Sequence, residues 1–150
     1  MKTVRHEFVE YIPEELEKGV VYISVAYGIV AHSCCCGCGM EVSTPLSPTD
    51  WKLTYDGESI SLYPSIGNWN FSCKSHYWIT NNRIKWAGQW SATKIKEGQQ
   101  QEKYEKAVYY EKKKAKASKG ERELLEATKE ESCTSANGIW VKMKKWFFNL

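Results

Sequence analysis

The sequence has no run of about 18 apolar residues, so it lacks the signal of a transmembrane helix. Residues 1–10 also lack the apolar stretch of a secretory signal peptide. No glycine-rich phosphate loop, paired-carboxylate motif or His-Glu-x-x-His motif occurs. These absences argue against a membrane-spanning protein, a secreted protein, a nucleotide-binding protein and a helical metalloprotease. We therefore expect a cytoplasmic protein.

A strong excess of charge is also missing. The chain has 21 basic and 18 acidic residues, a net charge of +3, and most basic residues are interleaved with acidic ones. This pattern argues against nucleic acid as a partner. The 150 residues, with 42% hydrophobic and 26% charged side chains, suffice for one globular unit. Seven Trp and nine Tyr favour either a core rich in β-sheet or an aromatic contact surface over a helical bundle.

The first ninety residues read mainly as strands. Residues 20–25 are a continuous β-branched and aromatic run, and residues 29–33 look like the next strand. Residues 51–55 and 59–63 predict a hairpin around Asp56-Gly57, and residues 76–79 and 84–86 predict another around Asn81-Asn82. Glutamates before Gly19 predict one short helical turn.

After residue 93 the composition changes to Lys, Glu, Gln and Ala, which predicts a solvated helix, broken or kinked near Gly120. Asn137-Gly138 predicts a turn. Beyond it, apolar residues recur at helical spacing and favour a face that docks on the core over a membrane anchor: Trp140, Met143, Phe147 and Leu150. The expected fold class is α+β: a small zinc-stapled antiparallel β core over residues 1–93, with a helical extension over residues 94–150 that packs on it within one domain.

The strongest indication of chemical function is a cluster of cysteines. After His32 come three closely spaced cysteines, Cys34, Cys36 and Cys38, with glycines at positions 37 and 39, and a distant Cys73 and His76 follow. Thiolate and imidazole donors suit zinc, and glycines let the backbone curl around an ion. An iron-sulfur centre and free thiols are the alternatives. The Cys-x-Cys with a distant Cys-x-x-His is similar to a Rieske-type pattern, which needs His at position 38.

The spacing leaves the fourth ligand open. Cys36, Cys38 and Cys73 are the preferred ligands, and either Cys34 or His76 completes the set. If Cys34 does so, His32 and His76 are both available for other chemistry. We expect Cys35 to be a non-ligand.

A second signal is Ser65, which lies in the segment Tyr-Pro-Ser-Ile-Gly-Asn. Backbone N–H groups near Gly67, with the Asn68 amide, would stabilise an oxyanion beside this serine. A histidine within hydrogen-bond reach would be needed as the base. A serine in such a segment is more commonly an ordinary turn residue, and nothing in the sequence selects an orienting acid among Asp50, Asp56 and Glu58.

Together these motifs resemble a family of small bacterial proteins, the BubE family, whose genes accompany ubiquitination-like (Bub) systems. The resemblance extends over about residues 6–90 and rests on these blocks: residues 8–10, 12–13, 16–24, 32–39, 42, 44–51, 61–69 and 73–79. It implies a serine-protease-type deconjugating enzyme that acts on the C-terminal tail of a ubiquitin-like protein. On this sequence the nucleophile would be Ser65, the base His76 or His32, and zinc would lie on the cysteine cluster.

The leading hypothesis is therefore a zinc-stapled peptidase that processes a ubiquitin-like protein, with the system's activating or conjugating enzymes as further partners. The tail of the partner would add as a strand to a sheet edge, beside a groove for which the candidate lining residues are Trp69, Tyr77, Trp78 and Trp86. The alternative is a non-catalytic zinc adaptor for the ubiquitin-like protein or its conjugating enzyme. A redox protein is the third reading.

Overall fold

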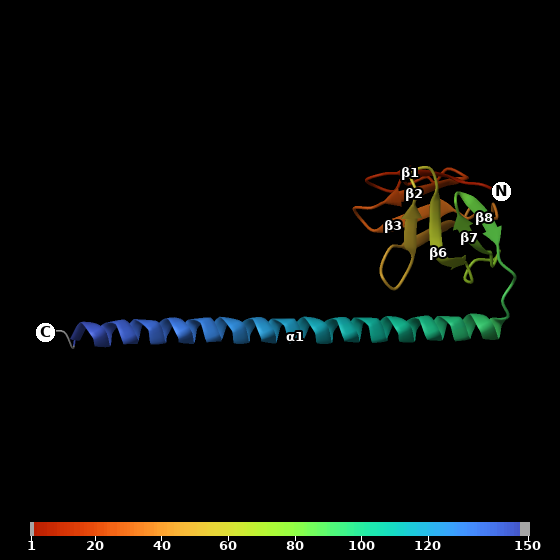
Figure 1. The fold of residues 1–150 in the computed structure, drawn as a ribbon. Coiled ribbons are helices and arrows are strands. Elements are labelled where there is room, and N and C mark those ends of the chain that lie inside the picture. The colour runs from red at the N-terminus through yellow and green to blue at the C-terminus, as the bar shows by residue number, and fades with distance from the viewer. Residues whose placement is uncertain (1, 148–150) are drawn as a thin grey trace. The chain divides into compact units, whose positions relative to one another are not determined.

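The computed structural model describes the backbone of residues 2–147 and the side chains of residues 2–119 and 121. The chain divides into two compact units, Met1–Glu102 and Lys103–Leu150. The first unit holds two four-stranded sheets in chain order, β1-β2-β3-β4 and β5-β6-β7-β8 (Figure 1). The elements are β1 (Arg5–Phe8), β2 (Val20–Ser24), β3 (Ile29–Ser33), β4 (Glu41–Pro45), β5 (Lys52–Tyr55), β6 (Ile60–Gly67), β7 (His76–Thr80), β8 (Arg83–Trp86) and α1 (Ala92–Phe147).

The predicted α+β class is confirmed, with one addition to its topology. All neighbouring strands pair antiparallel except β1, which pairs parallel with β2. Both predicted hairpins are present, β5–β6 and β7–β8. The turn glycine Gly57 has a φ of +100°, and Asn81 and Asn82 have φ of +48° and +57°, which suits the left-handed turns that join short hairpins. The predicted helical turn before Gly19 is wrong, because that segment forms only bends and turns.

One hydrophobic core joins the inner faces of the two sheets. The first sheet contributes residues such as Val21, Ile23 and Val30, and the second contributes Ile60 and Tyr77. All five residues of β2 are buried, which explains why that strand is a continuous apolar run and not an alternating one. The two sheets therefore pack face to face around shared side chains.

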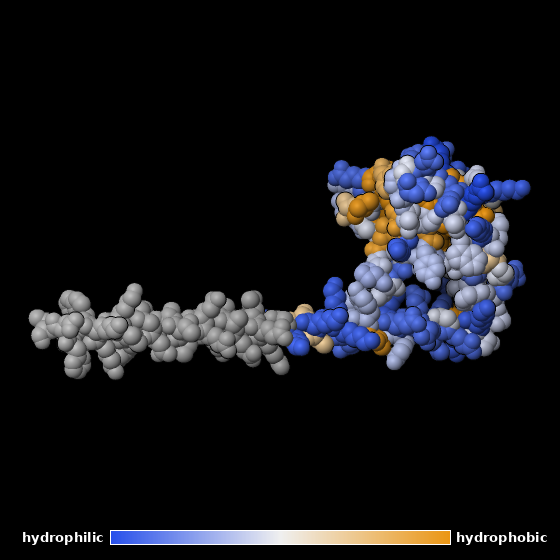
Figure 2. Space-filling model, in the orientation of Figure 1, coloured by the Kyte–Doolittle hydropathy of each residue, from blue (hydrophilic) through white to orange (hydrophobic). Residues whose placement is uncertain are grey.

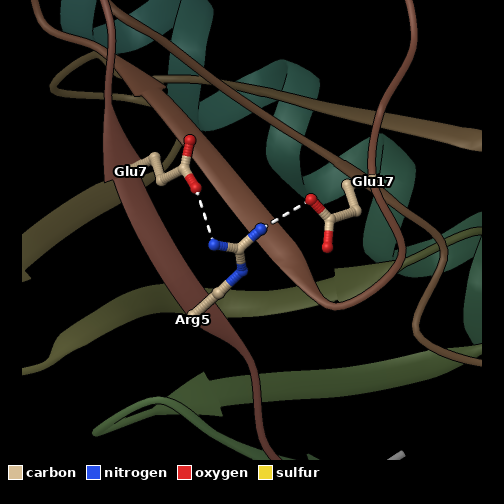
Figure 3. A network of polar contacts seen from close by, with 3 residues as sticks. All are labelled: Arg5, Glu7 and Glu17. Atoms are coloured by element: carbon tan, nitrogen blue, oxygen red, sulfur yellow. Dashed lines mark hydrogen bonds and ion pairs between the residues drawn. The ribbon is translucent and has the colours of Figure 1, made fainter.

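The segment before β1 links the two sheets at one end. The Val4 N–H donates to the Asn82 carbonyl at 2.8 Å, and the Ile84 N–H donates to the Lys2 carbonyl at 3.0 Å. The Arg5 guanidinium also contacts Glu7 at 3.0 Å and Glu17 at 2.6 Å (Figure 3). These ion pairs lie within the first sheet and its β1–β2 connection, and because they are exposed they contribute little stability.

The C-terminal element α1 is one continuous helix of 56 residues. The predicted break near Gly120 and the predicted turn at Asn137-Gly138 are therefore wrong. The described side chains from Glu111 to Lys119 are exposed, and the described part of the helix is mostly hydrophilic (Figure 2). The side chains of the predicted docking face lie outside the described ones, and its packing on the core stays a prediction. Within the described residues, no helix combines the length and apolarity needed to span a bilayer.

Candidate functional site

An irregularity in β6 determines where Ser65 lies. Leu62 pairs with Ile79 and Ile66 pairs with Tyr77, so β6 has two more residues than β7 between the same two pairings. The extra residues form a β-bulge over residues 63–65, which includes the cis Tyr63-Pro64 bond. Bulges bend a strand and re-aim its side chains, and they are common beside functional sites.

At the end of the bulge, Ser65 lies next to His76, the first residue of β7. The distance between Ser65 Oγ and His76 Nε2 is 2.9 Å. On its other side the His76 ring lies 3.3 Å, from Nδ1, to the main-chain oxygen of Gly88. A carbonyl oxygen only accepts, so Nδ1 carries the proton, and in the neutral ring Nε2 is then the acceptor for the Ser65 hydroxyl. The geometry is that of a nucleophile and its base, held by a third group.

The group that orients His76 is thus a main-chain carbonyl, not one of the acids considered from the sequence. Asp50 accepts a hydrogen bond from Ser47 at 2.5 Å. Asp56 binds the N–H groups of Glu58 and Ser59 within the β5–β6 turn, and these backbone bonds lower its pKa to about 2. The Asp56 carboxylate thus serves its own turn, and the contacts of the two His76 nitrogens are to Ser65 and Gly88.

Three tryptophans enclose the His76 ring. The ring centroid of His76 lies 4.9 Å from Trp69, 5.6 Å from Trp78 and 5.1 Å from Trp90. Trp69 and Trp90 stack on each other at 5.5 Å, with an interplanar angle of 21°. His76 is only 5% exposed as a result. Such an enclosure restricts the ring and limits competition from water for its hydrogen bonds.

The four cysteines Cys34, Cys36, Cys38 and Cys73 form a second cluster, with all their sulfurs within 4.8 Å of one another. The Sγ atoms of Cys34 and Cys36 are 3.4 Å apart, and those of Cys38 and Cys73 are 3.7 Å apart. Zinc bound by four thiolates at about 2.3 Å separates the sulfurs by roughly 3.8 Å. The arrangement therefore fits a tetrahedral metal ion, and these four residues could hold one.

Two loops build this cluster from opposite sheets. The β3–β4 loop closes through the Cys34 N–H to Met40 carbonyl bond of 2.8 Å, with Gly37 and Gly39 at φ of +88° and +81°. Those angles are in the left-handed region, which favours glycine. Cys73 comes from the β6–β7 loop, closed by the Asn68 N–H to Ser75 carbonyl bond of 2.9 Å. A metal ion would thus tie the loop between Ser65 and His76 to the other sheet.

The surroundings of the sulfurs act in opposite directions on two of the thiols: desolvation raises the pKa of Cys36 to about 12, whereas the pKa of Cys73 is lowered. Ser75 Oγ lies 3.1 Å from Cys34 Sγ and 3.5 Å from Cys73 Sγ. Desolvation raises the pKa of the Cys73 thiol, but hydrogen bonds from Ser75 and from neighbouring thiols outweigh it and lower that pKa to about 6. Outer contacts of this kind orient the ligands of metal sites. Cys35 does not belong to the cluster: it is buried in the core, and desolvation raises its pKa to about 11.

His32, the alternative base, lies elsewhere. Its Nε2 is 2.8 Å from the Tyr77 hydroxyl, and its Nδ1 is buried with no hydrogen-bond partner among the described residues. Tyr77 is a core residue of β7, and its side chain points away from the face that carries its neighbour His76. Desolvation lowers the pKa of His32 to about 4. The structure therefore does not bring His32 to Ser65.

The comparisons with known proteins give one match. A family model described as bacterial ubiquitination-like system serine protease (BubE) matches residues 8–87, more than half of the chain. The chain belongs to the BubE family. No curated protein and no solved structure matches it.

The matched BubE segment contains most of the site but not all of it. Ser65, His76 and the four clustered cysteines lie within residues 8–87, whereas Gly88, Trp90 and α1 lie beyond it. Sequence reasoning missed Gly88 and Trp90 as site residues. A main-chain acceptor carries no signature in a sequence, and one tryptophan among seven does not stand out.

The two residues proposed for the oxyanion have different surroundings in this BubE protein. The Asn68 amide donates to Ser75 Oγ at 2.9 Å and lies 3.7 Å from Cys34 Sγ, so it faces the cysteines. Gly67 ends β6 opposite His76. Tyr77 and Trp86, two of the four residues considered as a groove lining, contact each other at 5.3 Å, and Tyr77 is fully buried.

Proposed function

We propose that this BubE protein is a serine peptidase that hydrolyses the bond joining the C-terminus of a ubiquitin-like protein to an extension or a target. The observation that carries the proposal is the Ser65 Oγ to His76 Nε2 distance of 2.9 Å. The family description supports it independently, because it names a serine protease of a bacterial ubiquitination-like system.

In the proposed reaction, Ser65 Oγ attacks the carbonyl carbon of the scissile bond while His76 Nε2 takes the hydroxyl proton. The carbonyl of Gly88, 3.3 Å from Nδ1, holds the imidazolium that forms. His76 then gives the proton to the leaving group, which leaves the tail as an ester on Ser65. Water, activated by the same ring, hydrolyses that ester. Because Asn68 faces the cysteines, main-chain N–H groups are left to bind the oxyanion.

We also propose that Cys34, Cys36, Cys38 and Cys73 hold a structural zinc ion. Four sulfurs at near-tetrahedral spacing form a closed site with no position for a substrate. The ion would fix the loop that connects Ser65 to His76. A colourless purified protein with one zinc per chain is expected, and bound iron with visible absorbance would contradict it.

The test is covalent labelling followed by processing. A fluorophosphonate probe should modify Ser65, located by peptide mass spectrometry, and the protein should process the ubiquitin-like protein of its own system. Ser65→Ala and His76→Gln should each lower processing by at least about 10³-fold. Ser61→Ala is the matched control, since Ser61 lies on the same strand but bonds to Asn81 at 3.0 Å.

Zinc content and thermal stability should be unchanged in Ser65→Ala. Processing that persists in this variant would show that Ser65 is not the nucleophile. Wild-type protein that binds the ubiquitin-like protein and never cleaves it would favour the adaptor.

A further inference from the structure

The end of β6 that carries Ser65 has an unpaired edge. On one side β6 pairs with β7 as far as Gly67. On the other side β5 stops at the pair of Lys52 and Tyr63, so among the described residues no strand pairs there with residues 64–67. The unpaired stretch therefore starts at the bulge and includes the nucleophile.

The direction of the main-chain groups at this edge follows from the neighbouring hydrogen bonds. The His76 carbonyl accepts from the Ala87 N–H at 2.9 Å, so the main chain of His76 faces β8. The Asn68 N–H donates to the Ser75 carbonyl at 2.9 Å, which makes Asn68 and Ser75 a hydrogen-bonded pair. Antiparallel pairs alternate, so Gly67 and His76 form a pair without hydrogen bonds.

It follows that the N–H and C=O of Gly67 point away from β7, into the open edge. No backbone hydrogen bond outside the strands reaches Gly67 within the described residues. Its side-chain position is filled by the Trp69 indole, so only its main chain is available for recognition. Unpaired strand edges of this kind bind extended chains through main-chain hydrogen bonds.

We propose that the substrate of this enzyme binds as an added β-strand along residues 64–67, with its main chain hydrogen-bonded to Gly67. This inference rests on the proposed function. The substrate class is an extended, flexible polypeptide tail, recognised by its amide groups, with the scissile carbonyl delivered to Ser65 two residues away. A folded loop does not meet this requirement, because its amides are already paired.

The test is an N-methyl scan of the tail. The probe is the ubiquitin-like protein of the same system, made by semisynthesis with one tail amide methylated at a time. Methylation removes one donor and leaves the side chain intact. Alternate positions should be sensitive, each losing about tenfold in kcat/KM, and the positions between them should be tolerant. A loss that does not alternate, or tolerance at every position, overturns the proposal.

A second measurement tests the same contact on the enzyme, at the Gly67 amide. In the complex of Ser65→Ala with the unmodified ubiquitin-like protein, hydrogen exchange at the Gly67 amide should slow at least tenfold. Unchanged exchange at Gly67 in a saturated complex contradicts strand addition. If the unmodified substrate is cleaved through Ser65 and the scan shows no alternation, the proposal of strand addition is wrong and the proposed peptidase function is retained. If the unmodified substrate is never cleaved, the proposed peptidase function is wrong, and so is the inference that rests on it.

Discussion

Gly67 and His76 lie directly opposite each other at the end of the β6–β7 ladder, and the indole of Trp69 fills the space that a side chain at position 67 would take. A Cβ placed on Gly67 would lie 2.5 Å from the Trp69 ring. The same ring contacts His76 at 4.9 Å. Glycine at this position therefore sets the position of the tryptophan and, through it, of the His76 ring.

Gly67→Ala should consequently lower both stability and activity. We expect a loss of about 1–3 kcal/mol in the free energy of unfolding, from overpacking against a ring. A fall of at least tenfold in kcat/KM should accompany it, because the displaced indole moves His76. Urea denaturation and processing kinetics measure the two effects. Combining Gly67→Ala with Trp69→Leu should recover stability, and a purely additive double variant would contradict the steric explanation.

Disruption of the proposed zinc site should loosen the arrangement of Ser65 and His76. Cys73→Ser should abolish stoichiometric zinc binding and lower the melting temperature, since a structural zinc site contributes directly to folding. Fluorophosphonate labelling of Ser65 should slow as well, because Cys73 lies in the loop between Ser65 and His76. Metal analysis, thermal melts and labelling rates provide the readouts. Cys35→Ala is the control and should keep its zinc, as Cys35 lies outside the cluster.

The buried His32 should make the fold sensitive to acid. Its pKa in the folded protein is lowered to about 4 by desolvation, below the ordinary 6.5. Between these values the unfolded chain binds more protons, so the free energy of unfolding falls as the pH falls, by roughly 3 kcal/mol over the whole interval. His32→Gln should flatten this dependence relative to wild type. Metal loss in acid affects both proteins, so the difference between their denaturation curves is the decisive quantity.

The first unit should fold without most of the helix. Every residue of the hydrophobic core cluster lies between Val4 and Ile84, and the unit boundary follows Glu102. A chain that ends at Glu102 should retain one zinc per chain, a cooperative thermal transition and Ser65 labelling. Circular dichroism and labelling of the truncated protein test this. A molten or insoluble product would show that residues 103–150 are required for the fold.

The sequence allowed prediction of those elements whose determinants are local. Both hairpins followed from their turn residues, and the β2 and β3 strands from their apolar runs. The strands β1 and β4 were missed because neither turn chemistry nor strong hydrophobicity marks them. Because β1 and β2 pair in parallel, the chain between them must cross back over the length of the strands and cannot be a tight turn. Local sequence patterns do not encode such pairing.

The candidate site divides in the same way. Four cysteines at short spacings predict a cluster, and the structure places their sulfurs together. Whether His76 or His32 lies next to Ser65 depends on strand register and on the opposite faces of β7 that His76 and Tyr77 occupy, because Tyr77 is the residue that contacts His32. Two extra residues in β6 determine that register, and neither hydropathy nor turn chemistry locates them. The Gly88 contact involves a backbone oxygen, whose position depends on the whole fold.

The bulge of β6 separates two strand registers. Continued from the pair of Leu62 and Ile79, the ladder would place Ser65 directly opposite His76, whereas the register of Ile66 and Tyr77 places it opposite Trp78. The serine therefore reaches the imidazole diagonally across the ladder. A residue inserted into this stretch or removed from it would shift the serine along β7 and leave all four clustered cysteines unchanged.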